Sequence, residues 1–228
     1  MNNVIEFSRG QNGRNLENGK TKTVRSYDTV KYFTKDQIQL IRKAARDSAS
    51  LALTKRRPRV GAVRVWMVID LITSTGLRVA EAADIRCGDI KSGYGQSELY
   101  VRDGKGHVSR TIQIPKTLKT HLNQFLKWKQ NRNEPTGKDD YLFTGQRGPW
   151  KSSGIQQAVK VLLKSLNLYE KGRSVHALRH SYAFQLYRRQ RDLRAVQKQL
   201  GHAHIQTTTI YADVSKEDIQ QQITGLWN

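Results

Sequence analysis

Apolar residues recur at helical spacing through most of the chain, and this pattern begins near residue 33. The first helix is predicted to begin after Thr34, because Thr34 and Gln37 fit a capping box. Phe33 and Ile38 can pack against each other across that box as a hydrophobic staple. Ordered structure is therefore expected to start at this point of the chain.

A second helical stretch stops at Gly76, and a shorter helix follows over 77–85. The apolar face of the second helix is formed by Val65, Val68, Ile69 and Ile72. Residues 97–115 instead alternate apolar and polar positions around Asp103 and Gly104, which is typical of a β-ribbon with a tight turn.

Helical spacing returns in four later segments, 117–130, 154–168, 175–186 and 194–200. Gly201 is predicted to end the last of these helices after Leu200. Neither an internal repeat nor a low-complexity tract interrupts the pattern. The sequence therefore predicts an α+β fold that is mostly helical, with one small antiparallel β-sheet.

Residues 1–32 are polar, rich in Asn and Gly, and show no apolar periodicity, so we expect a flexible basic N-terminal arm. Residues 1–60 contain fourteen Lys or Arg against five Asp or Glu. A solvated tail and an arm that follows DNA both fit this composition. We divide the chain into the arm, 1–32, and one folded domain, 33–228.

The whole chain is strongly basic, with a net charge of +21 over 228 residues and a pI near 10.3. Such a balance favours a polyanionic partner, most often nucleic acid, although ribosomal and membrane-surface proteins share it. The single cysteine, Cys87, excludes an internal disulfide and fits a reducing compartment. Without a signal peptide or a membrane-spanning apolar run, we expect a cytoplasmic, DNA-associated protein with no membrane partner.

Four separate stretches place polar, chemically active residues beside turn signals: "TGLRVAE" (75–81), "DGKGHVSR" (103–110), "HALRH" (176–180) and "LGHAHIQTTTIYADV" (200–214). Each stretch alone is a weak signal. His176 and Arg179 are three residues apart and would share one face of a helix. A phosphodiester would use both, because it needs cationic donors for its oxygens and a group that handles a proton.

Together, and in this order, the four stretches resemble the catalytic domain of the tyrosine recombinases, the phage integrase family. The resemblance covers about residues 33–220. It assigns catalysis to Arg78, Lys105, His176, Arg179, His202 and Tyr211, with Glu81 and His180 in supporting positions. It implies a site-specific DNA recombinase that cuts and rejoins strands through a 3′-phosphotyrosine and a Holliday junction.

The chemistry of these residue types agrees with that implication. Two guanidinium groups, Arg78 and Arg179, can hold the charge that develops on a phosphate under attack, with His202 as a further donor. Tyr211 needs a proton acceptor, for which we expect His176. Lys105 on the ribbon can protonate the leaving 5′ oxygen. The bond energy is kept in the phosphotyrosine, so we expect neither ATP nor another cofactor.

The sequence departs from the family pattern in two ways. Val108 stands where members often carry a second ribbon lysine, while Arg110 falls where a basic residue is common. Most members also have a core-binding domain where only about thirty polar residues precede Phe33, so the chain looks like the minimal members, similar in size to fimbrial phase-switch invertases. The residues predicted to bind DNA are Lys55, Arg56, Arg57, Arg59 and Arg110.

A metal site is the rival interpretation of the histidines His176, His180, His202 and His204. We expect none, because no carboxylate or cysteine accompanies them at ligand spacing. His180 and His204 could each serve only as a hydrogen-bonding neighbour.

The resemblance further implies a homotetramer assembled on two double-stranded recombination sites, and an accessory DNA-bending protein would fit a chain with little besides its catalytic domain. Segment 215–228 has an apolar face that in the family docks on a neighbouring subunit, although packing on its own domain fits equally well. Two other functions stay open: a type IB topoisomerase-like nicking and closing enzyme, and a non-catalytic DNA-binding regulator on the same scaffold.

Overall fold

The computed structural model describes residues 31–54, 60–104, 108–145 and 148–212. Most of the predicted arm, the basic residues Lys55, Arg56, Arg57 and Arg59, the ribbon tip with Lys105, and the final segment 215–228 lie outside this part of the chain. The predictions made for them are therefore not addressed by the fold.

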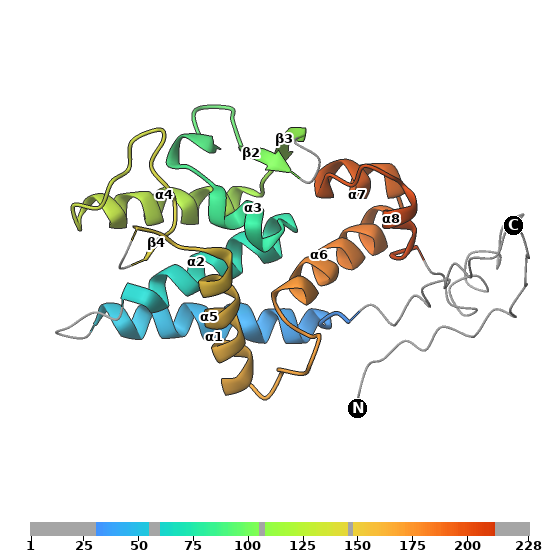
Figure 1. The fold of residues 1–228 in the computed structure, drawn as a ribbon, viewed down its shortest axis with the longest axis horizontal. Helices are drawn as coiled ribbons and strands as arrows, with labels where there is room; N and C mark the ends of the chain where they lie inside the picture. The colour runs from blue at the N-terminus through green and yellow to red at the C-terminus, as the bar shows by residue number, and fades with distance from the viewer. Residues whose placement is uncertain (1–30, 55–59, 105–107, 146–147, 213–228) are drawn as a thin grey trace, which may run out of the picture.

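The first helix, α1 (Lys35–Leu53), begins as its sequence predicts. Thr34 is the N-cap residue, and the Gln37 backbone N–H donates to its side chain while the Thr34 N–H donates to Gln37 Oε1 at 3.1 Å. Both halves of the capping box are thus present. Figure 1 shows α1 lying alongside α2 (Val60–Thr75), which ends directly before Gly76 as predicted.

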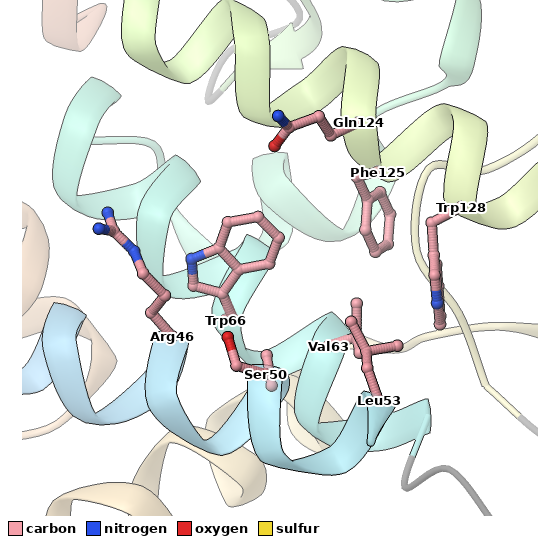
Figure 2. A pocket seen from close by; sticks show the side chains of 9 residues that line it. Arg46, Ser50, Leu53, Val63, Trp66, Gln124, Phe125 and Trp128 are labelled. Carbon is pink, nitrogen blue, oxygen red and sulfur yellow. The ribbon is translucent and has the colours of Figure 1, made fainter. Parts of the chain in front are cut away.

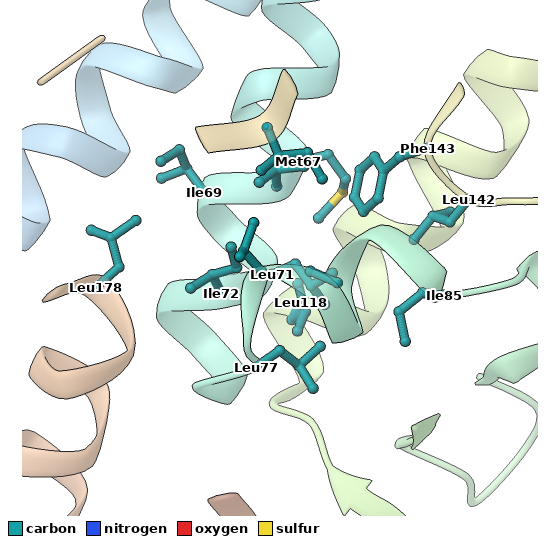
Figure 3. Close-up of a cluster of buried hydrophobic side chains, with 14 of the residues drawn as sticks. Met67, Ile69, Leu71, Ile72, Leu77, Ile85, Leu118, Leu142, Phe143 and Leu178 are labelled. Carbon is teal, nitrogen blue, oxygen red and sulfur yellow. The ribbon is translucent and has the colours of Figure 1, made fainter. Parts of the chain in front are cut away.

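Helix α2 forms the centre of the main hydrophobic core. Its residues from Met67 through Thr75 are all buried, so this C-terminal part of the helix is covered on every side and not on a single face. Figure 3 shows Met67, Ile69 and Leu71 among side chains contributed by other elements, including Phe143 and Leu178. The predicted apolar stripe was therefore too narrow a description of this helix.

The predicted β-ribbon is confirmed as part of a three-stranded antiparallel sheet, in the order β1 (Ile90–Lys91), β2 (Glu98–Gly104), β3 (Val108–Gln113). Gly104 pairs with Val108, so the connection spans 105–107, and Asp103 and Gly104 belong to β2 rather than to the turn. The two short strands β4 (Thr144–Gly145) and β5 (Gly148–Pro149) form a second pair that the sequence did not predict.

The remaining helices are α3 (Val79–Asp84), the 3₁₀ turn Cys87–Asp89, α4 (Lys116–Gln130), α5 (Ser152–Ser165), α6 (Val175–Gln190), α7 (Leu193–Leu200) and α8 (Gln206–Thr209). The mostly helical α+β fold is thereby confirmed. Among the helices that the structure describes, none is both long and apolar enough to cross a membrane.

Helix α6 connects the main core to a second, smaller hydrophobic cluster. Its N-terminal half contributes Leu178 to the main core, while Ala183 further along packs with Val196, Leu200 and Tyr211. Figure 1 shows α7 and α8 gathered at one end of α6, with the β2–β3 ribbon next to α7. The predicted catalytic segments therefore meet where the small cluster joins the ribbon.

Buried polar contacts hold the helices of the main core together. Asp70 on α2 is 2% exposed and accepts hydrogen bonds from Arg42 on α1 and from His121 Nδ1 on α4 at 2.7 Å. A satisfied buried carboxylate of this kind fixes how its neighbours pack. Lys129 is also buried, and its ammonium donates to the backbone oxygens of Tyr141 and Leu142 at 2.6 and 3.1 Å.

The last two residues of the predicted arm contact the folded domain. Tyr32 stacks on Phe184 of α6 with ring centroids 4.8 Å apart, and Lys31 Nζ donates to the Lys171 carbonyl at 2.7 Å. The Phe33 backbone N–H donates to Ser181 Oγ at 2.7 Å. The chain is thus fixed to the start of α6 from residue 31 onward.

Candidate active site

The turn after α2 sets the position of Arg78. Gly76 adopts φ +69°, and a Cβ there would stand 2.4 Å from the Tyr182 ring, so both backbone conformation and space require glycine. The turn buries Leu77 and places Arg78 at the N-cap of α3. The Arg78 backbone N–H donates to Glu81 Oε2 and its Nη1 donates to Oε1, both at 2.8 Å.

Glu81 is the centre of a cluster of three arginines. Besides Arg78, it accepts two hydrogen bonds from Arg110 on β3, at 3.0 and 3.1 Å, and Arg179 Nη1 lies 3.7 Å from its Oε2. Burial opposes the charged carboxylate, but the bonds from Arg110 and Arg78 outweigh it and keep the pKa of Glu81 below its usual value. Glu81 is therefore ionised at neutral pH.

Arg179 is held by backbone oxygens from two distant turns. Its Nη1 donates to the Gly76 carbonyl at 2.6 Å and its Nη2 to the Leu200 carbonyl at 3.0 Å. Burial, together with repulsion from Arg78, lowers the pKa of Arg179 to about 10, which leaves it charged at neutral pH. The side chain is rigidly placed next to Arg78, as phosphate binding by two guanidinium groups requires.

His202 follows Gly201, which ends α7 in the left-handed conformation with φ +66°, as predicted. The His202 Nδ1 lies 2.9 Å from Thr208 Oγ1 on α8. Burial, with added repulsion from Arg179 and Arg78, lowers the pKa of His202 to about 4. The imidazole is therefore neutral at physiological pH, and its position is fixed by Thr208.

Tyr211 lies between two histidine rings and is only 3% exposed. Its hydroxyl is 2.8 Å from His180 Nδ1, and the His180 and His202 ring centroids are 5.9 and 6.4 Å from its own. Burial raises the pKa of Tyr211 to about 12, although Arg179 and Arg78 act in the opposite direction. Burial, together with Arg179, lowers the pKa of His180 to about 4, so a neutral Nδ1 can accept the hydroxyl proton.

The structure brings together Arg78, Glu81, Arg179, His180, His202 and Tyr211 from the predicted set, and it corrects two expectations. The partner of the Tyr211 hydroxyl is His180 and not His176, which lies one turn earlier on α6 and is exposed. Arg110, which was predicted to bind DNA, is only 12% exposed, and both of its terminal nitrogens bind Glu81 instead. Lys105 and 55–59 lie outside the described residues.

Sequence reasoning missed the groups that position the predicted catalytic side chains. Thr208 is fully buried and orients His202, but the sequence shows it only as one threonine of the "TTT" run. The carbonyls of Gly76 and Leu200 carry no side-chain signal. Within the described residues, no group of three or more His, Cys, Asp or Glu could hold a metal ion.

Two hollows in the described surface lie away from this site. One, of about 210 Å³, lies between α1, α2 and α4 beside Trp66, Phe125 and Trp128, as Figure 2 shows. The other is lined by residues that include Arg64 and Trp150. Neither is lined by a predicted site residue. The cluster around Glu81 and Tyr211 is thus distinct from both hollows.

Residues 31–218 match the sequence profile of the phage integrase family. The chain belongs to this family. The tyrosine recombinase XerA of Pyrococcus horikoshii is 34% identical over 163 residues, which cover 71% of this chain and 54% of the relative. XerD of Listeria innocua is 33% identical over 165 residues, covering 70% and 54%. The chain thus spans about half the length of these curated relatives.

Solved structures of phage integrase family members show the same fold. The crystal structure of XerA recombinase gives a TM-score of 0.67 at 25% identity and covers 85% of this chain and 64% of that chain. The pre-cleavage complex of XerH site-specific recombinase with its difH substrate gives 0.69 at 24% identity, covering 86% and 54%. At 24% identity the second likeness concerns the fold alone.

Proposed function

We propose that this phage integrase family chain is a site-specific DNA recombinase that cleaves one strand with Tyr211 and leaves a 3′-phosphotyrosine. The observation that carries the proposal is the placement of the Tyr211 hydroxyl on His180 beside two rigidly held arginines, Arg78 and Arg179. A nucleophile, a proton acceptor and paired guanidinium groups are the parts that phosphoryl transfer to a side chain needs.

In the proposed step, the Tyr211 oxygen attacks the scissile phosphorus and the bond to the 5′ oxygen breaks. Arg78, Arg179 and His202 stabilise the charge on the non-bridging oxygens. The hydroxyl proton passes to His180, and Lys105 protonates the departing 5′ oxygen. The reverse attack by a free 5′-hydroxyl reseals the strand, so no ATP is consumed. His176, being exposed, is free to contact the DNA backbone in this scheme.

The resting arrangement protects the nucleophile. Because burial raises the pKa of Tyr211 and lowers that of His180, transfer of the proton between them is strongly uphill in the absence of DNA. A bound phosphate changes this balance, since its negative charge between Arg179 and the tyrosine favours a protonated His180. In this scheme His180 is already in place as the proton acceptor, but Tyr211 ionises only when the DNA substrate is bound.

The test is covalent trapping on duplex DNA that carries a nick next to the scissile phosphate. Wild-type protein should form an adduct stable to denaturant, and Tyr211→Phe should bind the same DNA and form none. Tyr169→Phe is the matched control, because the Tyr169 ring packs against Lys160 and Lys164 of α5 and not against the site residues, and it should form adduct at the wild-type rate. Adduct formation by Tyr211→Phe would show that another residue is the nucleophile and would refute the assignment.

The proposed role of Lys105 is tested with a substrate that has sulfur in place of the bridging 5′ oxygen. A thiolate leaves without a proton, because the thiol reference pKa is about 8.5. Lys105→Ala should therefore cleave ordinary DNA about 10²–10⁴-fold more slowly but cleave the sulfur substrate at nearly the wild-type rate. Arg78→Ala should stay slow on both, and failure of sulfur to rescue Lys105→Ala would exclude the general-acid role.

We further propose that the chain acts as a homotetramer on two DNA sites, with segment 215–228 joining neighbouring subunits and an accessory DNA-bending protein assisting assembly. Truncation after Val214 should then spare strand cleavage more than complete recombination, whereas equal loss of both would favour packing within one chain. Relaxation of supercoiled DNA without a defined site, by a monomer, would indicate a topoisomerase-like activity instead.

A further inference from the structure

Arg110 lies on β3, five residues after Lys105, but its guanidinium reaches into the active site. The side chain is only 12% exposed, and its two terminal nitrogens bind the two Glu81 oxygens at 3.0 and 3.1 Å. This bidentate geometry is the strongest form of an arginine–carboxylate pair. Arg110 is therefore committed to Glu81 and joins the ribbon to the start of α3.

The same guanidinium packs against the turn that carries His202. A Cβ at Gly201 would stand 2.7 Å from Arg110 Cζ and 2.7 Å from its Nε, so only glycine leaves room for the arginine. Gln199 on α7 also donates to the Gln113 carbonyl of β3 at 3.0 Å. Arg110 thus sits where the ribbon, α3 and the end of α7 converge.

The negative charge of Glu81 has two opposing effects in this cluster, and Arg110 can offset the unfavourable one. Glu81 orients Arg78 through two hydrogen bonds, yet its negative charge also reduces the attraction of Arg78 and Arg179 for a phosphate. Three guanidinium groups and one carboxylate leave a net charge of +2, and without Arg110 the net charge falls to +1. A phosphodiester carries one negative charge, and its pentacovalent transition state carries two.

We propose that Arg110 is a positioning residue that neutralises Glu81, so that Glu81 can orient Arg78 without weakening the charge offered to the scissile phosphate. The proposal rests on the proposed recombinase function and specifies how the net positive charge of the same site is maintained. Because the effect grows with the charge on the phosphate, it stabilises the transition state more than the bound substrate. Arg110 itself touches neither the phosphate nor Tyr211.

The first measurement is single-turnover cleavage of the nicked duplex at saturating protein. Arg110→Met keeps most of the side-chain length and removes the charge, and it should cleave about 10²-fold more slowly, as when one preorganised donor is lost. DNA affinity should change little. Arg102→Met is the matched control, because Arg102 lies on β2 of the same sheet but pairs with the buried Asp89 of the 3₁₀ turn and not with Glu81. Its cleavage rate should stay within about twofold of wild type.

Two further measurements separate charge from structure. Glu81→Gln added to Arg110→Met returns the net charge to +2, so the double variant should cleave faster than Arg110→Met alone. A substrate with a methylphosphonate at the scissile position lacks one negative charge, and on it the defect of Arg110→Met should shrink at least tenfold. Loss of packing alone predicts neither effect, because it does not depend on the charge of the partner or of the phosphate.

Three outcomes would overturn the proposal while leaving the recombinase function intact, provided that wild type forms the Tyr211 adduct. Wild-type cleavage by Arg110→Met would show that Glu81 needs no neutralisation. An equal defect on both substrates, with no rescue by Glu81→Gln and a lowered unfolding free energy, would assign Arg110 to packing. If Arg110→Met bound DNA more weakly, released about one ion fewer on binding and cleaved normally at saturation, Arg110 would be a direct phosphate contact.

Discussion

Lowering the pH from 7.5 to 5 should reduce the free energy of unfolding of this domain by about 4 kcal/mol. The cause is the pair of buried histidines, His180 and His202, whose pKa values of about 4 in the folded chain compare with 6.5 when exposed. Between these two values the unfolded chain binds protons that the folded chain does not, so stability falls as the pH falls. Each histidine contributes about 2 kcal/mol over this interval.

The buried carboxylate of Glu81 does not contribute to this loss. The pKa of Glu81 lies below its usual value of 4.5, so the stability it contributes is present above that pH and is lost only below it. The assay is urea unfolding followed by tryptophan fluorescence, since Trp66, Trp128 and Trp150 pack against the main core. Measurements at pH 7.5, 6 and 5 should show a steepening loss.

Variants identify the source of the loss. The double variant His180→Gln with His202→Gln should lose much less stability between pH 7.5 and 5 than the wild type. His176→Gln, at an exposed position of the same helix, should behave like wild type. A loss that persists unchanged in the double variant, or a wild-type unfolding free energy that is equal at both pH values, would refute the assignment of neutral, buried imidazoles.

Three further predictions concern stability, each read from the shift in urea unfolding. Gly201→Ala should cost about 2 kcal/mol, because φ +66° disfavours a side chain and the new Cβ would displace Arg110; an unchanged midpoint would contradict this. Arg191→Gly should stabilise the domain by up to about 1 kcal/mol, because Arg191 ends α6 in the left-handed region with φ 54°. Loss of its contact with the Tyr187 ring reduces this gain, and a destabilised variant would show that the contact dominates. Asp70→Ala should cost about 1–2 kcal/mol, because Arg42 and His121 lose the carboxylate they share although both side chains keep some access to water. An unchanged unfolding free energy would argue against this dependence on Asp70.

Local signals account for the parts of the fold that the sequence predicted well. The capping box at Thr34 and Gln37, the break at Gly76 and the left-handed Gly201 each depend on residues within one or two turns of the backbone. The interactions that produce each of these features lie within a short segment, so the features can be recognised from the sequence alone. The predicted catalytic residues came from the order of the motifs along the chain, which is also read directly from the sequence.

The parts that escaped prediction depend on packing between distant segments. His176 and His180 are one helical turn apart, and only the position of Tyr211 decides which of them faces it. Arg110 and Glu81 are 29 residues apart on different elements, and no spacing rule pairs them. The αL conformation of Arg191 was equally hidden, because arginine gives no signal for that backbone region.

The small hydrophobic cluster around Tyr211 has a consequence for how this proposed nucleophile becomes available. Its buried members are Ala183, Val196, Leu200 and Tyr211, whereas the main core draws on α1 through α6. Local opening costs only the contacts that are broken, so residues near α8 can detach while the main core stays folded. In native-state hydrogen exchange, amides near Tyr211 should therefore exchange at a lower opening free energy than those of α2, which should exchange only through global unfolding. Such opening would expose Tyr211, the proposed nucleophile, but it must leave Leu200 in place, because the Leu200 carbonyl holds Arg179.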